Sequence, residues 1–96
     1  MQPSLDDILN LNKLDLPSDP KVDEIEWYPF TDSLGDPAYR ITVILADDTP
    51  PAHRERKLTR EIENRIREAL HKAGIEEFPY IRNATRADLK WAEEHR

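Results

Sequence analysis

The chain has 96 residues, of which 38% are hydrophobic and 35% charged, and its net charge is −6. This length is typical of a single domain, and the hydrophobic fraction is sufficient for one modest core. There is no cysteine, which excludes disulfides, thiolate metal sites and thiol nucleophiles. The first residues form no basic leader and no apolar run reaches membrane length, so a cytoplasmic protein is expected.

The acidic charge is unevenly distributed. Residues 1–52 carry a net charge of −8, whereas residues 53–72 carry +3. A protein that is acidic overall resists nonspecific association with nucleic acid. Any anion-binding face is therefore expected to be local and to lie within the basic segment.

A short helix is expected at the N-terminus, where Ser4 can cap it and acids occupy its first turn. Its apolar residues share one face: Leu5, Ile8 and Leu9. Prolines end the pattern. The chain is accordingly divided into residues 1–18, a short helix with a proline-bounded connection, and residues 19–96, a single α+β domain.

A β-hairpin is predicted next. Residues 22–31 are strand formers, residues 33–37 have turn chemistry, and residues 39–46 alternate in the manner of a strand. In the second strand, one face begins polar and becomes apolar, which predicts that this face is covered only at its far end. The first strand has two faces, one with Ile25 and Trp27 and the other with Tyr28 and Phe30.

The most regular pattern predicts a long helix that Gly74 ends. Its apolar residues fall within an arc of about 120°: Leu58, Ile62, Ile66, Ala69, Leu70 and Ala73. A third strand over residues 78–82 follows. Thr85 and Asp88 then form a capping-box pattern that opens a last helix extending to about His95.

These elements give an α+β fold with a small three-stranded sheet and the order α-β-β-α-β-α. Pro29 and Pro79 fall in the first and third strands, and proline cannot donate to an interior ladder. The second strand is therefore expected to be central. A crossover through the long helix then lays the third strand parallel to the second. The alternative is that the third strand pairs with the first.

No catalytic or cofactor-binding motif is present. Ser4, Ser18 and Ser33 lie in capping or turn contexts, and two glycines are too few for a glycine-rich phosphate loop. His53 and His71 would lie about 27 Å apart on one continuous helix, which excludes a zinc site built from them. We therefore expect a non-enzymatic protein without a cofactor or a metal centre.

The nearest approach to a metal site is a group of acids that the hairpin brings to one end: Asp23, Glu24, Asp47 and Asp48. Such a group has the ligand type that hard divalent cations prefer. The commoner alternative is an acidic loop pair that faces water, and no calcium-loop spacing is present.

The long helix carries a basic row opposite its apolar stripe, within an arc of about 80°: Arg56, Arg60, Asn64, Arg67 and His71. Its arginines are the candidate anion or nucleic-acid face. Acid–base pairs at i,i+4 spacing instead favour an ordinary solvent-exposed helix: Glu61–Arg65, Glu63–Arg67 and Glu68–Lys72. No aromatic residue interleaves the row for base stacking.

Two apolar groups are candidate anchors for a protein partner, the face of Leu5, Ile8 and Leu9 and the side chain of Trp91. The N-terminal leucines either pack across their own sheet, which still needs cover, or dock into another chain. On the last helix, Trp91 points away from Leu89, so one of the two is expected to stay exposed.

The aromatic segments 27–30 and 78–80 form either the rim of an interface or half of the core. The leading hypothesis is a non-enzymatic interaction or accessory module that binds a larger protein partner or a second copy. The alternative is nucleic-acid or phosphate binding through Arg56, Arg60 and Arg67.

Overall fold

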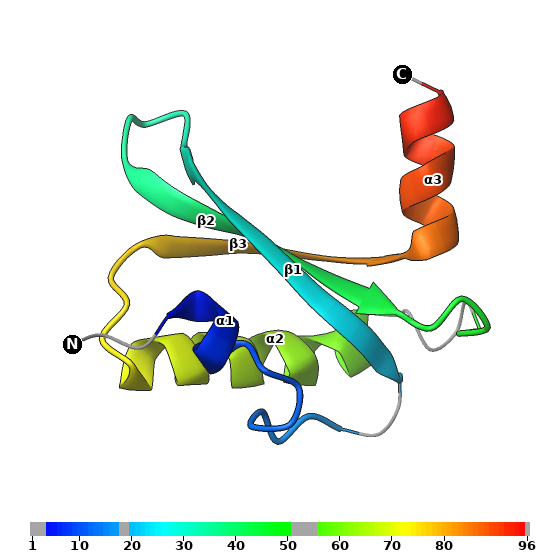
Figure 1. Cartoon of the computed structure of the whole chain (residues 1–96), viewed down its shortest axis with the longest axis horizontal. Helices are drawn as coiled ribbons and strands as arrows, with labels where there is room; N and C mark the ends of the chain where they lie inside the picture. Colours follow the sequence, from blue (N-terminus) through cyan, green and yellow to red (C-terminus); the bar gives the residue numbers. More distant parts are fainter. Residues whose placement is uncertain (1–3, 18–19, 51–55, 96) are drawn as a thin grey trace.

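The computed structural model describes residues 4–17, 20–50 and 56–95, the side chains of residues 56–58 excepted (Figure 1). The predicted order and the α+β class are confirmed. The helices and strands are α1 (Leu5–Ile8), β1 (Val22–Thr31), β2 (Pro37–Leu45), α2 (Arg56–Lys72), β3 (Phe78–Thr85) and α3 (Arg86–Glu94).

Within the described residues the strands form one sheet in the order β1-β2-β3. The central strand β2 pairs antiparallel with β1 and parallel with β3, as predicted, and β3 does not pair with β1. Pro29 and Pro79 both lie on edge strands and both are level with Tyr39 of β2. Because both prolines lie on edge strands, the N–H groups that they lack interrupt no hydrogen-bond ladder in the interior of the sheet.

The third strand is longer than predicted and runs to Thr85 instead of Arg82. Arg82 and Asn83 are weak strand formers, so the sequence pattern ends early. Parallel pairing with β2 nonetheless continues as far as Leu45 and Thr85. Thr85 is therefore both the last residue of β3 and the N-cap of α3, where the predicted capping box with Asp88 is present.

The core lies between one face of the sheet and α2. Ile41, Val43 and Leu45 of β2 are at most 1% exposed and belong to one buried cluster with the apolar stripe of α2. That stripe contributes Ile62, Ile66 and Leu70, as the helical spacing predicted. Figure 1 shows α2 lying along the lower side of the sheet.

The N-terminal segment belongs to the same core. Leu5, Leu9 and Leu14 are buried in the cluster that α2 and β2 form, and Ile8 packs against it. The indole N–H of Trp27 donates to Oδ1 of Asp6 at 2.7 Å and ties α1 to β1. The N-terminal leucines therefore pack across their own sheet, and none of them is left as an exposed anchor.

Gly74 ends α2 as predicted. Its φ is +79°, in the left-handed region that favours glycine. The Gly74 N–H donates to the carbonyl of His71, and the N–H of Ile75 donates to that of Leu70. This pair of bonds is the Schellman pattern, and it turns the chain from α2 towards β3.

The opposite face of the sheet is covered only at one end, as the polarity change along β2 predicted. Thr42 and Ile44 are at most 4% exposed, whereas Tyr28 and Phe78 are more than half exposed. In Figure 1, α3 rises from the end of β3 on the side away from α2. None of the described helices has the length and apolar character needed to cross a lipid bilayer.

Candidate binding surface

Four aromatic side chains meet on the open face of the sheet and are named here the aromatic patch: Tyr28, Phe30, Phe78 and Tyr80. The ring centroids are 6.4 Å apart for Tyr28 and Phe30, 5.4 Å for Phe30 and Tyr80, and 4.8 Å for Tyr80 and Phe78, within the range of aromatic pairs. Tyr28 is 53% and Phe78 57% exposed. The patch is thus a continuous apolar surface that water reaches.

The strand register produces this patch. Phe30 of β1 and Phe78 of β3 flank Ala38 of β2, while Tyr28 and Tyr80 flank Arg40. Residues level across a sheet point to the same face. The small side chain of Ala38 leaves room between the rings of the two edge strands, so aromatics that lie far apart in the sequence converge.

Arg40 lies among the rings. Its guanidinium carbon is 5.2 Å from the centroid of Phe30, a cation–π contact. Its Nε atom is buried and makes no hydrogen bond within the described residues. The patch therefore holds a positive charge and an unused donor at its centre.

Asp32 fixes the position of Tyr80. The Tyr80 hydroxyl donates to Oδ2 of Asp32 at 3.1 Å, and Oδ1 accepts the N–H groups of Asp36 and Leu34. The Asp36 N–H, more than the Leu34 N–H and the Tyr80 hydroxyl, holds the pKa of Asp32 below its ordinary value. Desolvation and the Asp32 carboxylate raise the pKa of Tyr80.

Asp32→Asn is expected to lower stability at neutral pH, because asparagine keeps an acceptor but loses the charge. A carboxyl whose pKa is lowered by folding stabilises the fold above its unfolded pKa, and this contribution disappears as pH falls through the folded pKa. The difference between the variant and the wild type should therefore shrink below pH 3.8. Urea denaturation midpoints of both proteins at pH 7 and pH 3 measure this stability difference. An equal difference at the two pH values would show that the Asp32 carboxylate does not stabilise the fold.

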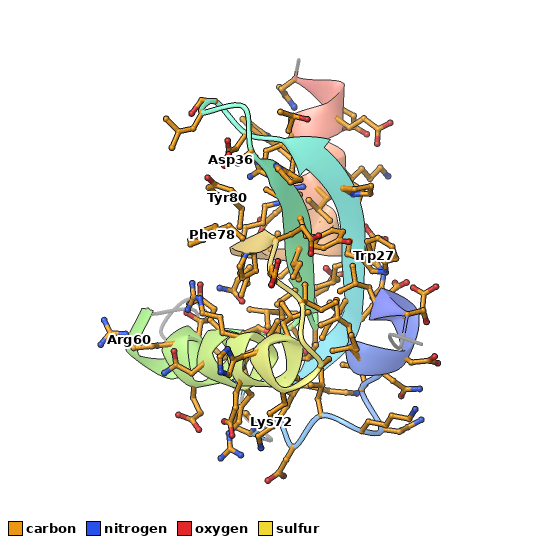
Figure 2. The ribbon with its side chains drawn as sticks, turned by 90° about the vertical axis from the view of Figure 1, so that its left-hand side faces the viewer. Trp27, Asp36, Arg60, Lys72, Phe78 and Tyr80 are labelled. Atoms are coloured by element: carbon orange, nitrogen blue, oxygen red, sulfur yellow. The ribbon has the colours of Figure 1, made fainter. Side chains whose placement is uncertain are left out.

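A groove runs beside Phe78 and Tyr80 along the outer side of β3. It encloses about 510 Å³ and lies between β3 and α2, with Pro79, Ile81 and Asn83 on one side and Thr59, Glu63 and Arg67 on the other; Arg40 also lines it. The Oδ1 atom of Asn83 is buried without a hydrogen-bond partner among the described residues. In the view of Figure 2, Phe78 and Tyr80 lie at left, above Arg60 of α2, whereas Trp27 lies at right beside α1.

The arginines of the predicted basic row are only partly placed. Arg60 and Arg67 are exposed, and neither makes an ion pair within the described residues, while the side chain of Arg56 lies outside them. Two of the predicted i,i+4 pairs form, Glu61–Arg65 and Glu68–Lys72, each at 3.0 Å. The Glu63–Arg67 pair does not form, so Arg67 faces the groove uncompensated.

The acidic end of the hairpin contacts Arg86 of α3, a neighbour that the sequence did not predict. The guanidinium of Arg86 contacts Asp23 at 3.0 Å and Glu24 at 2.9 Å. The Ala87 N–H donates to Oδ1 of Asp47 at 3.1 Å. These acids thus hold the first turn of α3, and no group of three or more metal-ligating side chains is found among the described residues.

Of the two apolar side chains on α3 that point in different directions, Trp91 and Leu89, Trp91 is the exposed one. It is 62% exposed and its ring stacks on that of His95, with centroids 4.2 Å apart, while Leu89 is half-buried. His71 is exposed and His53 lies outside the described residues. Trp91 therefore remains a candidate anchor.

Comparison of the chain with protein-family models, with curated proteins and with solved structures finds no significant match.

Proposed function

We propose that this protein is a non-enzymatic interaction module that binds a larger protein partner through the aromatic patch. The observation that carries the proposal is the exposure of Tyr28 and Phe78 at the ends of a continuous row of rings. Contiguous exposed apolar surface is typical of interaction sites, and tyrosine and phenylalanine are enriched in them.

The patch is also well ordered before any partner arrives. Tyr80 is held by Asp32, and Phe30 lies between Tyr80 and the guanidinium of Arg40. Binding to rings that are already fixed loses little side-chain entropy. Trp91 offers a second, separate anchor, and the expected compartment of such a module is the cytoplasm.

The test is partner recovery with the double variant Tyr28→Ala/Phe78→Ala as bait in extracts of the source cells. Truncation of central interface aromatics typically costs more than about 2 kcal/mol, so recovery should fall by more than about ten-fold. Trp91→Ala measures the second anchor. Leu11→Ala, in the N-terminal segment on the other face, is the matched control.

Equal recovery with the wild type and the double variant would remove the patch from the function. Circular dichroism melting of each variant establishes that the comparison is made between folded proteins. Because Tyr28 and Phe78 are both more than half exposed, their truncation should change stability little.

A second candidate function is nucleic-acid or phosphate binding by α2, favoured by the exposed side chains of Arg60 and Arg67, which form no ion pair with another described residue. It predicts binding to a single-stranded oligonucleotide that weakens steeply as salt rises and disappears in Arg60→Gln/Arg67→Gln. The net charge of −6 opposes it. A flat titration at low salt would end this candidate.

A further inference from the structure

Among the described residues β3 is an edge strand, so one side of its backbone faces no other strand. The N–H of Thr85 donates to Oδ2 of Asp88 at 3.2 Å, which indicates that this N–H is directed away from β2. Alternate residues of a strand direct their N–H and C=O to opposite edges. Ile81 and Asn83 therefore present both groups outward, and Pro79 presents a carbonyl, which agrees with the tendency of strand prolines to direct their nitrogen to solvent.

The groove lies directly along this edge. Its volume of about 510 Å³ is within the range of about 300–1,000 Å³ that ligand clefts occupy. α2 forms one wall with Thr59, Glu63 and Arg67, which are spaced four residues apart along one side of the helix. Phe78 and Tyr80 form the other wall, on the opposite face of the sheet.

Two buried polar atoms at the groove have no hydrogen-bond partner within residues 4–17, 20–50 and 56–95, the Nε donor of Arg40 and the Oδ1 acceptor of Asn83. Buried donors and acceptors without partners are rare because their desolvation is not compensated. A polypeptide backbone supplies both kinds of complement, a C=O acceptor for a donor such as Arg40 Nε and an N–H donor for an acceptor such as Asn83 Oδ1.

The charged side chains that line the groove determine which sign of charge a ligand should carry. Arg40 and Arg67 line it against the carboxylate of Glu63, and Arg60 extends the basic row of α2. Antiparallel pairing of β3 with β3 of a second copy would place the two α2 helices, with their basic rows, on the same face beside each other. Like charges there oppose self-pairing and favour an acidic segment.

From these observations we propose that β3 binds an extended acidic segment of a partner protein, which adds to the sheet as a fourth strand. Alternate residues of the added strand would point to opposite faces. One set meets Phe78 and Tyr80 and is apolar, and the other meets Arg67 and is acidic. This inference rests on the proposed function, because it names the class of segment that the module recognises.

The probe is an acetylated, amidated eight-residue peptide that alternates glutamate and valine, compared with the same peptide carrying lysine in place of glutamate. Residue-resolved amide exchange by NMR should show slower exchange at Ile81 and Asn83 when the glutamate peptide is added. The amides of Tyr80 and Arg82, already directed towards β2, should not change. The lysine peptide should leave all four unchanged.

Charge reversal supplies the second readout. Arg67→Glu should weaken binding of the glutamate peptide by about ten-fold or more, whereas Lys90→Glu, an equal reversal on the exposed surface of α3, should not. Both side chains are exposed, so both variants should fold. Equal loss in the two variants, or no protection at Ile81 and Asn83, would overturn strand addition.

Other occupants give different results. Protection of Ile81 and Asn83 without peptide, lost on dilution, would identify a second copy and overturn the proposal; so would equal protection by a single-stranded oligonucleotide. Loss of partner recovery in the Tyr28→Ala/Phe78→Ala variant with no effect of the peptide would leave the proposed function standing and reject only the strand addition.

Discussion

Ile66→Ala is expected to lower the free energy of unfolding by about 3–4 kcal/mol, within the range that large-to-small core substitutions cost. Ile66 has no exposed surface and lies in the middle of the α2 stripe, in the cluster with Ile41 and Val43 of β2. Both the lost burial and the cavity left between the helix and the sheet contribute.

Such a loss is a large part of the roughly 5–15 kcal/mol that stabilises a domain. For a chain of about 100 residues it corresponds to a fall in Tm of more than about 10 °C. Urea denaturation measures the change. The graded control Ile66→Val should cost about 0.5–1.5 kcal/mol, and an alanine effect no larger than the valine effect would show that α2 is not packed on the sheet at this point.

Leu9→Ala should be nearly as damaging, at about 2–4 kcal/mol, although Leu9 lies outside the regular sheet and helices. It is 5% exposed and is buried with Leu5 and Leu14 against the sheet. Leu34→Ala removes the same atoms from a side chain that is 82% exposed and should change stability by less than about 0.5 kcal/mol.

Equal effects of the two leucine substitutions would mean that the N-terminal segment is not part of the core. The larger expected effect of Leu9→Ala on stability also bears on the design of binding experiments. Removing residues 1–18 would uncover the buried cluster and unfold the domain, so loss of a partner in that truncation would report stability and not recognition.

The elements that the sequence predicted well are those whose signals are local. The periodicity of Ile62, Ile66 and Leu70 and the stop at Gly74 define α2 without knowledge of anything else. Pro29 and Pro79 placed β2 at the centre of the sheet, because a missing N–H restricts a strand wherever it lies.

The candidate site could be predicted from the sequence only in part, because it depends on the register between the strands. Both aromatic segments were noted as an interface rim or half of the core, yet only the alignment of Ala38 with Phe30 and Phe78 shows which rings meet. Tyr80 and Asp32 are joined across 48 positions of sequence, a pairing that no local pattern encodes. The alternation of Tyr28 and Phe30 was the one available signal.

The contact of Arg86 with the acidic hairpin end was missed for a similar reason. From the sequence, Asp23 and Glu24 belong to a cation-binding group or an acidic loop. The guanidinium that contacts them belongs to Arg86, more than 60 residues further along the chain, so no local pattern predicts the contact. The length of β3 is underestimated from the sequence, because pairing with β2, and not the strand propensity of Arg82 and Asn83, extends the strand to Thr85.

The direct junction at Thr85 has a mechanical consequence. No linker separates β3 from α3, and the capping box locks the turn between them. A small change in the direction of β3 is therefore passed to the helix as a lever arm. With nine residues at about 1.5 Å each, a tilt of about 10° at the junction displaces the far end of α3, and Trp91 near it, by about 2 Å.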